Sequence, residues 1–152
     1  MLWSAVRRPL AASAAELKRI STANGSMERT AAAEAVDLQQ QMLDALGRRA
    51  KRAGMASRIV LHRCRKESLA MEGPADFVLV FWMAHEVPDT PRFFREIFTL
   101  LKTEGRLLLV EPKVHVAKRS LERTLAACRE AGFRILDEPA VGLSRAFLLG
   151  RG

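Results

Sequence analysis

Residues 76–81 read DFVLVF, and residues 106–111 read RLLLVE. Both runs are short and largely apolar, as is typical of strands that are buried on both faces of a parallel sheet. Between them, Pro91 stands where proline is favoured in the first turn of a helix, and apolar residues continue at helical spacing up to residue 101. This order of strand, helix and strand predicts an α/β fold with a mostly parallel sheet.

The same alternation extends in both directions along the chain. Gly54 and Gly132 mark the ends of two further helices. The last two strands have no helix between them, so we expect them to be antiparallel neighbours at the edge of the sheet. The expected elements on either side are a helix over residues 38–53, a strand over 58–62, a helix over 116–131 and strands over 133–136 and 143–149, with turns at 73–74 and 103–105.

Residues 1–34 differ from the rest because they are rich in Ala, Ser and Arg and poor in β-branched residues. They predict at most two weakly amphipathic helices, over residues 11–20 and 27–35. We therefore treat residues 1–34 as an atypical segment that is helical or poorly ordered, and residues 35–152 as the α/β domain. The start of the chain resembles a transit peptide only loosely, because the acidic Glu16 follows its arginines and alanines, so we expect no targeting segment.

The composition limits the classes of partner. The formal net charge is +8, which is compatible with an anionic partner such as RNA. However, the basic residues are spread along the chain, and the one cluster (Arg48, Arg49, Lys51 and Arg52) stands at the end of a predicted helix, where cations suit the helix dipole. A nucleic-acid partner is therefore not favoured.

The cysteines and the hydropathy pattern also bear on location and metals. No stretch reaches the roughly 18 apolar residues that a membrane span needs. Cys64 and Cys128 do not form a metal-ligand spacing. Two such cysteines are typical of reduced, buried thiols, so we expect a cytoplasmic protein without a bound metal.

In an open α/β sheet, a ligand binds beyond the carboxyl ends of the strands. Four places meet this condition: Asp37, residues 65–69, residues 81–89 and residues 111–114. The candidate functional residues are therefore sought there.

Three segments resemble, in order, the class I S-adenosylmethionine-dependent methyltransferases, and in particular the type 11 or ubiquinone/menaquinone-like group. AVDL at residues 35–38, followed by Met42 and Leu43, is similar to the family's second strand and next helix. ADFVLVFWMAHEVPD at residues 75–89 is similar to the fourth strand and the loop after it, and LLKTEGRLLLVEP at residues 100–112 to a helix-turn-strand segment. The resemblance implies a Rossmann-like fold, S-adenosylmethionine as cofactor and a small-molecule methyl acceptor.

The resemblance also implies roles for residues of this chain. Asp37 matches the acid that accepts hydrogen bonds from both ribose hydroxyls, since a carboxylate offers two acceptors in one plane; the alternative is that it caps the helix that follows. Leu38 would lie against the adenine, or would be an ordinary core leucine. Phe81, Trp82 and Met83 match the stretch beneath the methionine part of the cofactor, with core packing as the alternative.

His85 follows the predicted fourth strand, near the expected place of the methyl acceptor. A neutral imidazole there could remove a proton from the acceptor, although methyl transfer from a sulfonium often needs only proximity and alignment. The alternative is a hydrogen bond that stabilises the loop. Glu86 and Asp89 are expected to be solvated, with Asp89 capping the helix that begins at Pro91.

Two departures from the family's pattern concern the cofactor. The family places an acid after its third strand, against the adenine amino group, whereas this chain has Arg65 and Lys66 there, with Glu67 next along as the candidate. The family also carries the glycine-rich loop Asp/Glu-x-Gly-x-Gly-x-Gly about twenty residues before the position of Asp37. This chain has only Gly25 in that place.

Without that loop, the family's first strand is missing or replaced. In the family this strand lies between the second and the fourth, so its loss exposes apolar edges and unpaired backbone groups. We therefore predict an S-adenosylmethionine-dependent methyltransferase that acts on a small-molecule acceptor and is truncated and weak or inactive. The alternative is a non-catalytic methyltransferase-like remnant that binds a protein or RNA partner.

Overall fold

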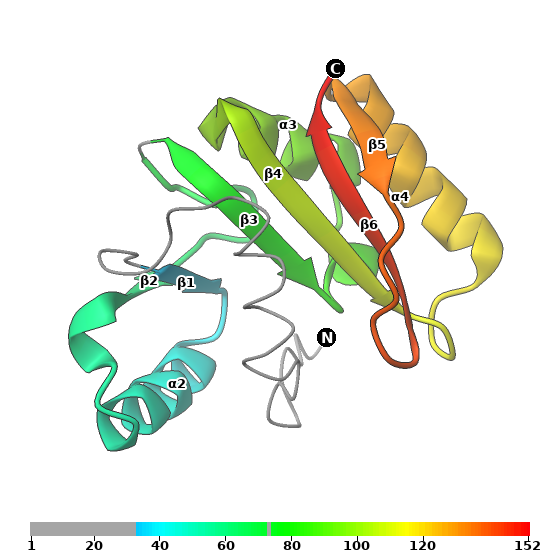
Figure 1. Ribbon diagram of the computed structural model, residues 1–152. Coiled ribbons are helices and arrows are strands. Elements are labelled where there is room, and N and C mark those ends of the chain that lie inside the picture. Colours follow the sequence, from blue (N-terminus) through cyan, green and yellow to red (C-terminus); the bar gives the residue numbers. More distant parts are fainter. Residues whose placement is uncertain (1–32, 73) are drawn as a thin grey trace. The chain divides into compact units, whose positions relative to one another are not determined.

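The computed structural model describes residues 33–72 and 74–152 (Figure 1). Within this range the chain divides into two compact units, one ending at Cys64 and the other beginning at Arg65. Strands alternate with helices in both units, which confirms the predicted α/β fold class. The boundary predicted at residue 34 stays a prediction, because residues 1–32 lie outside the described residues.

The first unit consists of a strand, a helix and a strand. Its two strands pair in parallel from Ala33 opposite Ile59 to Asp37 opposite Arg63. The helix contacts both strands, and Gly54, with φ +68°, follows its end as predicted. The elements are β1 (Ala33–Asp37), α2 (Gln40–Arg52), the short 3-10 helix η1 (Ala56–Arg58) and β2 (Ile59–Arg63).

The helix expected over residues 27–35 is wrong in its last part, because residues 33–35 belong to β1. Their alanines have a helical propensity, but the backbone hydrogen bonds to β2 outweigh so weak a local preference. The helix expected over residues 11–20, and the start of the one over 27–35, lie outside the described residues.

The second unit is a four-stranded sheet with the order β3-β4-β6-β5. β3 is parallel to β4, whereas β6 is antiparallel to both β4 and β5. The last two strands are therefore antiparallel neighbours, and β5 lies at the edge, as predicted. The elements are β3 (Ala75–Phe81), the 3-10 helix η2 (Ala84–Glu86), α3 (Thr90–Leu100), β4 (Leu101–Pro112), α4 (Lys118–Glu130), β5 (Phe133–Asp137) and β6 (Ser144–Arg151).

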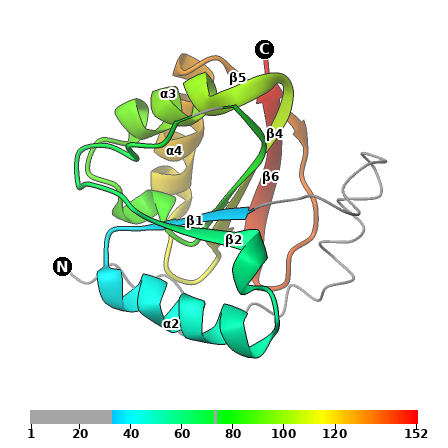
Figure 2. The same cartoon turned by 90° about the vertical axis from the view of Figure 1, so that its left-hand side faces the viewer.

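Both helices of the second unit, α3 and α4, cover the same face of this sheet (Figure 2). Leu107 and Leu109 of β4 belong to the core that this face shares with Phe94 and Ile97 of α3. The side chains that alternate with them, at positions 108 and 110, are buried too. β4 is thus buried on both faces, as its apolar run predicts.

β3 is not buried in the way that β4 is, although its apolar run predicts a strand that is buried on both faces. Among the described residues it pairs only with β4, and Leu79 keeps 38 % of its surface exposed. The single sheet expected from the sequence is also wrong, because the described strands form two sheets, β1-β2 and β3-β4-β6-β5. In the family that the sequence resembles, the first strand lies between the second and the fourth, and none of the described strands corresponds to it.

The turn expected at residues 103–105 is a bulge inside β4. Ala75 lies opposite Leu101 and Phe77 opposite Arg106, so residues 102–105 have no partners in β3. Gly105 makes this bulge feasible, because a Cβ there would lie 2.7 Å from Leu101 Cδ2 and 3.1 Å from the Ala75 oxygen. The bulge lets β4 begin directly after α3. The turn expected at residues 73–74 includes a residue outside the described range.

Candidate functional site

The carboxyl ends of β3 and β4 bring a buried acid against a histidine. Glu111, near the end of β4, is 0 % exposed. Its carboxylate accepts a hydrogen bond from the Ala84 N–H at 3.0 Å and lies 2.5 Å from Nδ1 of His85. Ala84 and His85 both belong to η2, the turn that follows β3. Two parallel strands that end side by side therefore place a general acid–base candidate where the sequence analysis expected one.

The electrostatics of this pair follow from its burial. Burial raises the pKa of Glu111, while the nearby charge and hydrogen bonds of His85 oppose that shift. When the carboxylate is ionised it can only accept, so Nδ1 of His85 donates to it, and Nε2 is the ring nitrogen with the lone pair in the neutral imidazole. The His85 side chain is 22 % exposed, and Nε2 lies 4.0 Å from an oxygen of Glu86. The pair thus leaves Nε2 as the ring nitrogen of a partly exposed histidine that Glu111 does not contact.

Trp82 fixes the start of the same turn. It has φ +55°, which is uncommon for a residue other than glycine. Its backbone N–H donates to the oxygen of Val110 at 2.8 Å, and its indole Nε1–H donates to Ser144 Oγ at 2.9 Å. The ring also stacks on Phe81, with ring centroids 5.2 Å apart. These contacts tie the turn to both β4 and β6, which stabilises a strained backbone conformation of the kind that clusters at functional sites.

The three residues assigned to the methionine part of the cofactor have different surroundings. Met83 packs against the core, in agreement with the core alternative. Phe81 is half-buried, and Trp82 keeps 43 % of its surface exposed, so Trp82 is not a core residue. The cofactor role of all three stays a prediction.

Asp37 ends β1 and belongs to the first unit. Its Oδ1 accepts a hydrogen bond from the Gln39 N–H at 2.7 Å. Gln39 itself is the N-cap of α2, so Asp37 does not cap that helix. Burial raises the pKa of Asp37, and the backbone hydrogen bonds oppose the shift. Leu38 is half-buried, and its oxygen accepts from Nε of Arg63.

The adenine candidate Glu67 lies in an exposed turn of the second unit. Backbone hydrogen bonds between Arg65 and Ser68 close this turn. Glu96 of α3 holds its end, because its Oε2 accepts from Ser68 Oγ at 3.2 Å and from the Leu69 N–H at 2.7 Å. The structure therefore places Glu67 with the residues of the second unit, and its contact with adenine stays a prediction.

Sequence reasoning did not name Glu111, the buried acid of the candidate site. It had singled out residues 111–114 only as a place at a strand end. The available signal was an acid inside an otherwise apolar strand, which is costly unless the acid is paired. Asp89 does cap α3 as predicted, since its Oδ1 accepts from the Arg92 N–H at 3.0 Å.

The described residues offer neither a metal site nor a membrane-spanning helix. In them, no three His, Cys, Asp or Glu side chains gather in a way that could hold a metal ion. Nor do residues 33–72 and 74–152 contain a helix with the length and apolar character that a membrane crossing requires.

Several solved structures share this fold. An S-adenosylmethionine-dependent methyltransferase from Aquifex aeolicus superposes with a TM-score of 0.66 at 17 % identity, covering 88 % of this chain and 74 % of that one. Mitomycin 7-O-methyltransferase MmcR gives a TM-score of 0.64 at 16 % identity, covering 91 % and 54 %. The [4+2]-cyclase SpnF gives 0.61 at 20 % identity, covering 80 % and 49 %.

These likenesses establish the fold. The chain spans about half the length of MmcR and of SpnF, at 54 % and 49 %. No curated protein sequence matches the chain significantly. The cyclase among the similar structures illustrates that this fold by itself does not specify a reaction.

The sequence identifies the family. A family profile described as "Methyltransferase domain" matches residues 13–109, which is more than half of the chain. The match includes every site residue predicted from the sequence and ends two positions before Glu111. The chain therefore belongs to the class I S-adenosylmethionine-dependent methyltransferases, in the group that this methyltransferase domain defines.

Proposed function

We propose that this chain transfers the methyl group of S-adenosylmethionine to a small-molecule acceptor, and that His85 takes the proton that the acceptor loses. The observation that carries the proposal is the pair formed by His85 and the fully buried Glu111 at the carboxyl ends of β3 and β4. A histidine that is oriented through Nδ1 by a carboxylate is suited to act as a base through Nε2. Family membership supports the reaction class.

The described residues fit one part of the cofactor. Burial raises the pKa of the Asp37 carboxyl, and the backbone hydrogen bonds that it accepts offset this only in part, so further hydrogen bonds would stabilise its charged form. The two hydroxyls of a ribose would supply such hydrogen bonds, which supports Asp37 as the residue that holds it. Leu38 and Glu67 are the candidates for the adenine, and Phe81, Trp82 and Met83 for the methionine end. When bound, S-adenosylmethionine supplies a methyl group activated by the sulfonium.

The proton has a defined route in this proposal. An O–H or N–H acceptor forms a bond to the methyl carbon as the carbon–sulfur bond breaks, and S-adenosylhomocysteine leaves. The acceptor's proton passes to Nε2 of His85, and the carboxylate of Glu111 stabilises the resulting imidazolium. General base catalysis of this kind contributes roughly 10²- to 10⁴-fold to a rate.

A second candidate is a non-catalytic remnant that binds a partner. The observation in its favour is that the described strands form two separate sheets, without the strand that the family places between β1 and β3. The chain also carries a single glycine, Gly25, where the family has its glycine-rich loop. We therefore propose that the chain as it stands binds the cofactor weakly.

Calorimetric titration with S-adenosylhomocysteine separates these candidates. We expect the unmodified chain to bind in the high micromolar to millimolar range, because losing a few contacts of about 1 kcal/mol each raises Kd roughly tenfold per 1.4 kcal/mol. A variant with a family-type first strand and glycine loop added before β1 should bind at least tenfold more tightly. If neither protein binds, the methyltransferase proposal fails and the remnant remains.

Nuclear magnetic resonance tests the role of His85 independently of any acceptor. The imidazole nitrogens of His85 should show the neutral Nδ1–H tautomer. A Glu111→Gln change should alter the His85 signals and leave those of His62, in the other unit, unchanged. An Nε2–H tautomer of His85 in the unmodified protein would contradict its assignment as the base.

A further inference from the structure

Basic residues occur along the whole chain, but in one stretch no acidic residue balances them. Residues 45–66 contain eight Lys or Arg and no Asp or Glu, and the whole chain has a formal net charge of +8. These 22 residues therefore carry a net charge of +8, and the charges of the rest of the chain cancel. Most of this stretch lies in the first unit, at the C-terminal end of α2 and in the elements that follow it.

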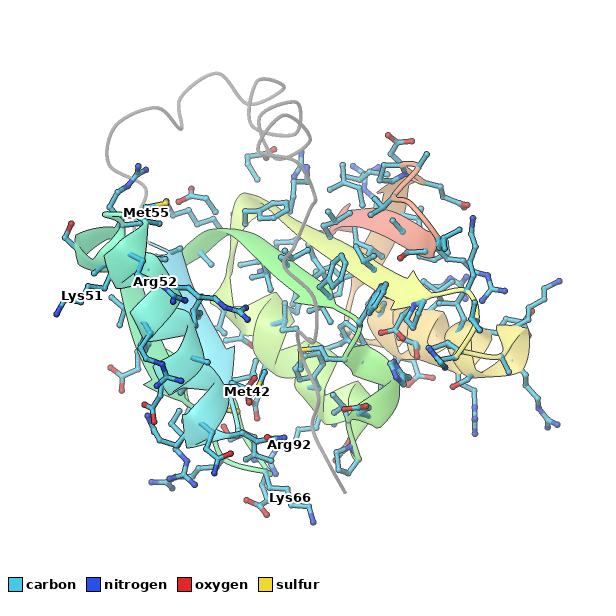
Figure 3. The ribbon with its side chains drawn as sticks, turned by 90° about the horizontal axis from the view of Figure 1, so that it is seen from below. Met42, Lys51, Arg52, Met55, Lys66 and Arg92 are labelled. Atoms are coloured by element: carbon cyan, nitrogen blue, oxygen red, sulfur yellow. The ribbon has the colours of Figure 1, made fainter. Side chains whose placement is uncertain are left out.

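Five cations form what we call the α2 basic cluster. All five side chains are exposed, and among the described residues none of them forms an ion pair with a carboxylate. The cluster lies at one end of α2, where Figure 3 shows Lys51, Arg52 and Met55 close together, with Met42 toward the other end. The members are Arg48, Arg49, Lys51, Arg52 and Arg58.

Three members of the cluster share one helix face. Arg48, Lys51 and Arg52 are spaced by three and four residues, so their side chains are neighbours. They line an open depression of about 450 Å³. Like charges at this spacing destabilise a helix, and among the described residues no carboxylate forms an ion pair with these three side chains. An anionic partner would offset the repulsion between them.

The helix dipole accounts for only part of the cluster. Its effect is confined to the last turn of a helix. Arg49, Lys51 and Arg52 occupy that turn, whereas Arg48 precedes it and Arg58 lies beyond α2 in η1. The helix dipole therefore does not explain the presence of Arg48 and Arg58 in the cluster.

We propose that the α2 basic cluster binds single-stranded RNA through its phosphate backbone. Four of its five members are arginines, whose planar guanidinium groups bind phosphate in a bidentate manner and stack on unpaired bases. A long polyanion can contact several side chains along an open surface, which a single small anion cannot do. The proposal does not depend on methyl transfer, because it uses only residues of the first unit outside the candidate site.

The surface around the cluster favours RNA over an anionic membrane. A helix that binds a membrane surface turns an apolar face outward. The buried residues of α2, Leu43 and Ala50, are apolar, and its face with Arg48, Lys51 and Arg52 is polar. The described residues of α2 and η1 include no exposed large apolar side chain; Met55, between the two helices, and Val60 and Leu61 of β2 are the exposed ones nearby in the sequence.

The test compares two variants that change the net charge equally. R48E/K51E/R52E reverses three charges of the cluster, and K118E/R119E/R123E reverses three exposed charges on α4. Fluorescence anisotropy measures binding of the full-length chain to a labelled 20-nucleotide single-stranded RNA at several salt concentrations. We expect the unmodified chain and the α4 variant to agree within threefold, and the α2 variant to bind at least tenfold more weakly.

The salt dependence gives a second readout. Each phosphate contact contributes about 0.7 to the slope of log K against log salt for single strands, so the α2 variant should lose about 2 units of slope. R48Q/K51Q/R52Q should reduce the slope by a similar amount. This variant replaces the glutamate variant in the test if circular dichroism shows that the glutamate variant does not fold. The proposal is overturned if both charge-reversal variants lose affinity equally, or if the unmodified chain does not bind the RNA at low salt. Stronger binding to phosphatidylserine vesicles or to duplex DNA of the same length would overturn it as well.

Discussion

Glu111 stabilises the second unit and is also part of the candidate site, so replacing Glu111 should lower the free energy of unfolding. A Glu111→Ala change takes the acceptor from the N–H of Ala84, which is 0 % exposed, at a cost of about 1–3 kcal/mol. It also removes the contact with His85, worth about 1.5–3 kcal/mol for a hydrogen bond that involves a charged group. Together we expect a loss of about 3–5 kcal/mol, the range found for breaking a buried charged pair.

Glu111→Gln separates the charge from the packing. Its amide oxygen can still accept one of the two hydrogen bonds, so the loss should be smaller, about 1–3 kcal/mol. Burial raises the pKa of Glu111 above its ordinary value of 4.5, so the folded state binds this proton more tightly than the unfolded state does. The stability from this group is therefore fully present below pH 4.5 and is lost as pH rises through the raised pKa. The glutamine variant should lack this decline, and its deficit relative to the parent should shrink as pH rises.

Urea unfolding followed by circular dichroism, repeated from about pH 4 to about pH 8, measures both effects. Glu122→Gln is the matched control, because Glu122 is exposed on α4 and the change is chemically the same. Identical pH dependence in the parent and the Glu111→Gln variant would refute the reasoning. So would a Glu111→Ala variant as stable as the Glu122→Gln control.

Further predictions concern the cofactor and the backbone. Asp37→Ala should weaken any binding of S-adenosylhomocysteine by about 1.5–3 kcal/mol, or roughly 10- to 100-fold in Kd. Asp44→Ala, on the exposed side of α2, should leave the affinity unchanged. If calorimetry finds equal affinities for the two variants, Asp37 does not hold the ribose. Gly132→Ala should destabilise the protein by about 1–3 kcal/mol in chemical unfolding, because φ is +103° and a Cβ would lie 2.9 Å from the Phe98 ring. Gly54→Ala should cost less, since φ is +68° but the space is open, and a larger loss there would contradict the steric argument. Binding of S-adenosylmethionine by the unmodified chain in the low micromolar range or tighter would disprove the expected weak binding.

Local signals were sufficient to predict most of the described helices and strands of this protein. Gly132 ends α4 because glycine readily adopts the positive φ that a helix end needs, and Asp89 caps α3 because its carboxylate reaches the N–H of a residue three positions on. The apolar run of β4 predicted a strand buried on both faces, which it is. The resemblance of three segments was enough to identify the family, and it placed Asp37 correctly at the end of a strand.

Contacts between distant residues became visible only in the folded chain. His85 and Glu111 are 26 positions apart in the sequence, and they meet because β3 and β4 pair in parallel and end side by side. The alternation of apolar residues says which side chains a strand buries, but not which strand lies beside each edge. β3 therefore looked like an interior strand, although β4 is its sole partner among the described strands. Strand pairing depends on backbone hydrogen bonds to a partner elsewhere in the chain, and the residues of the strand itself do not record whether that partner is present.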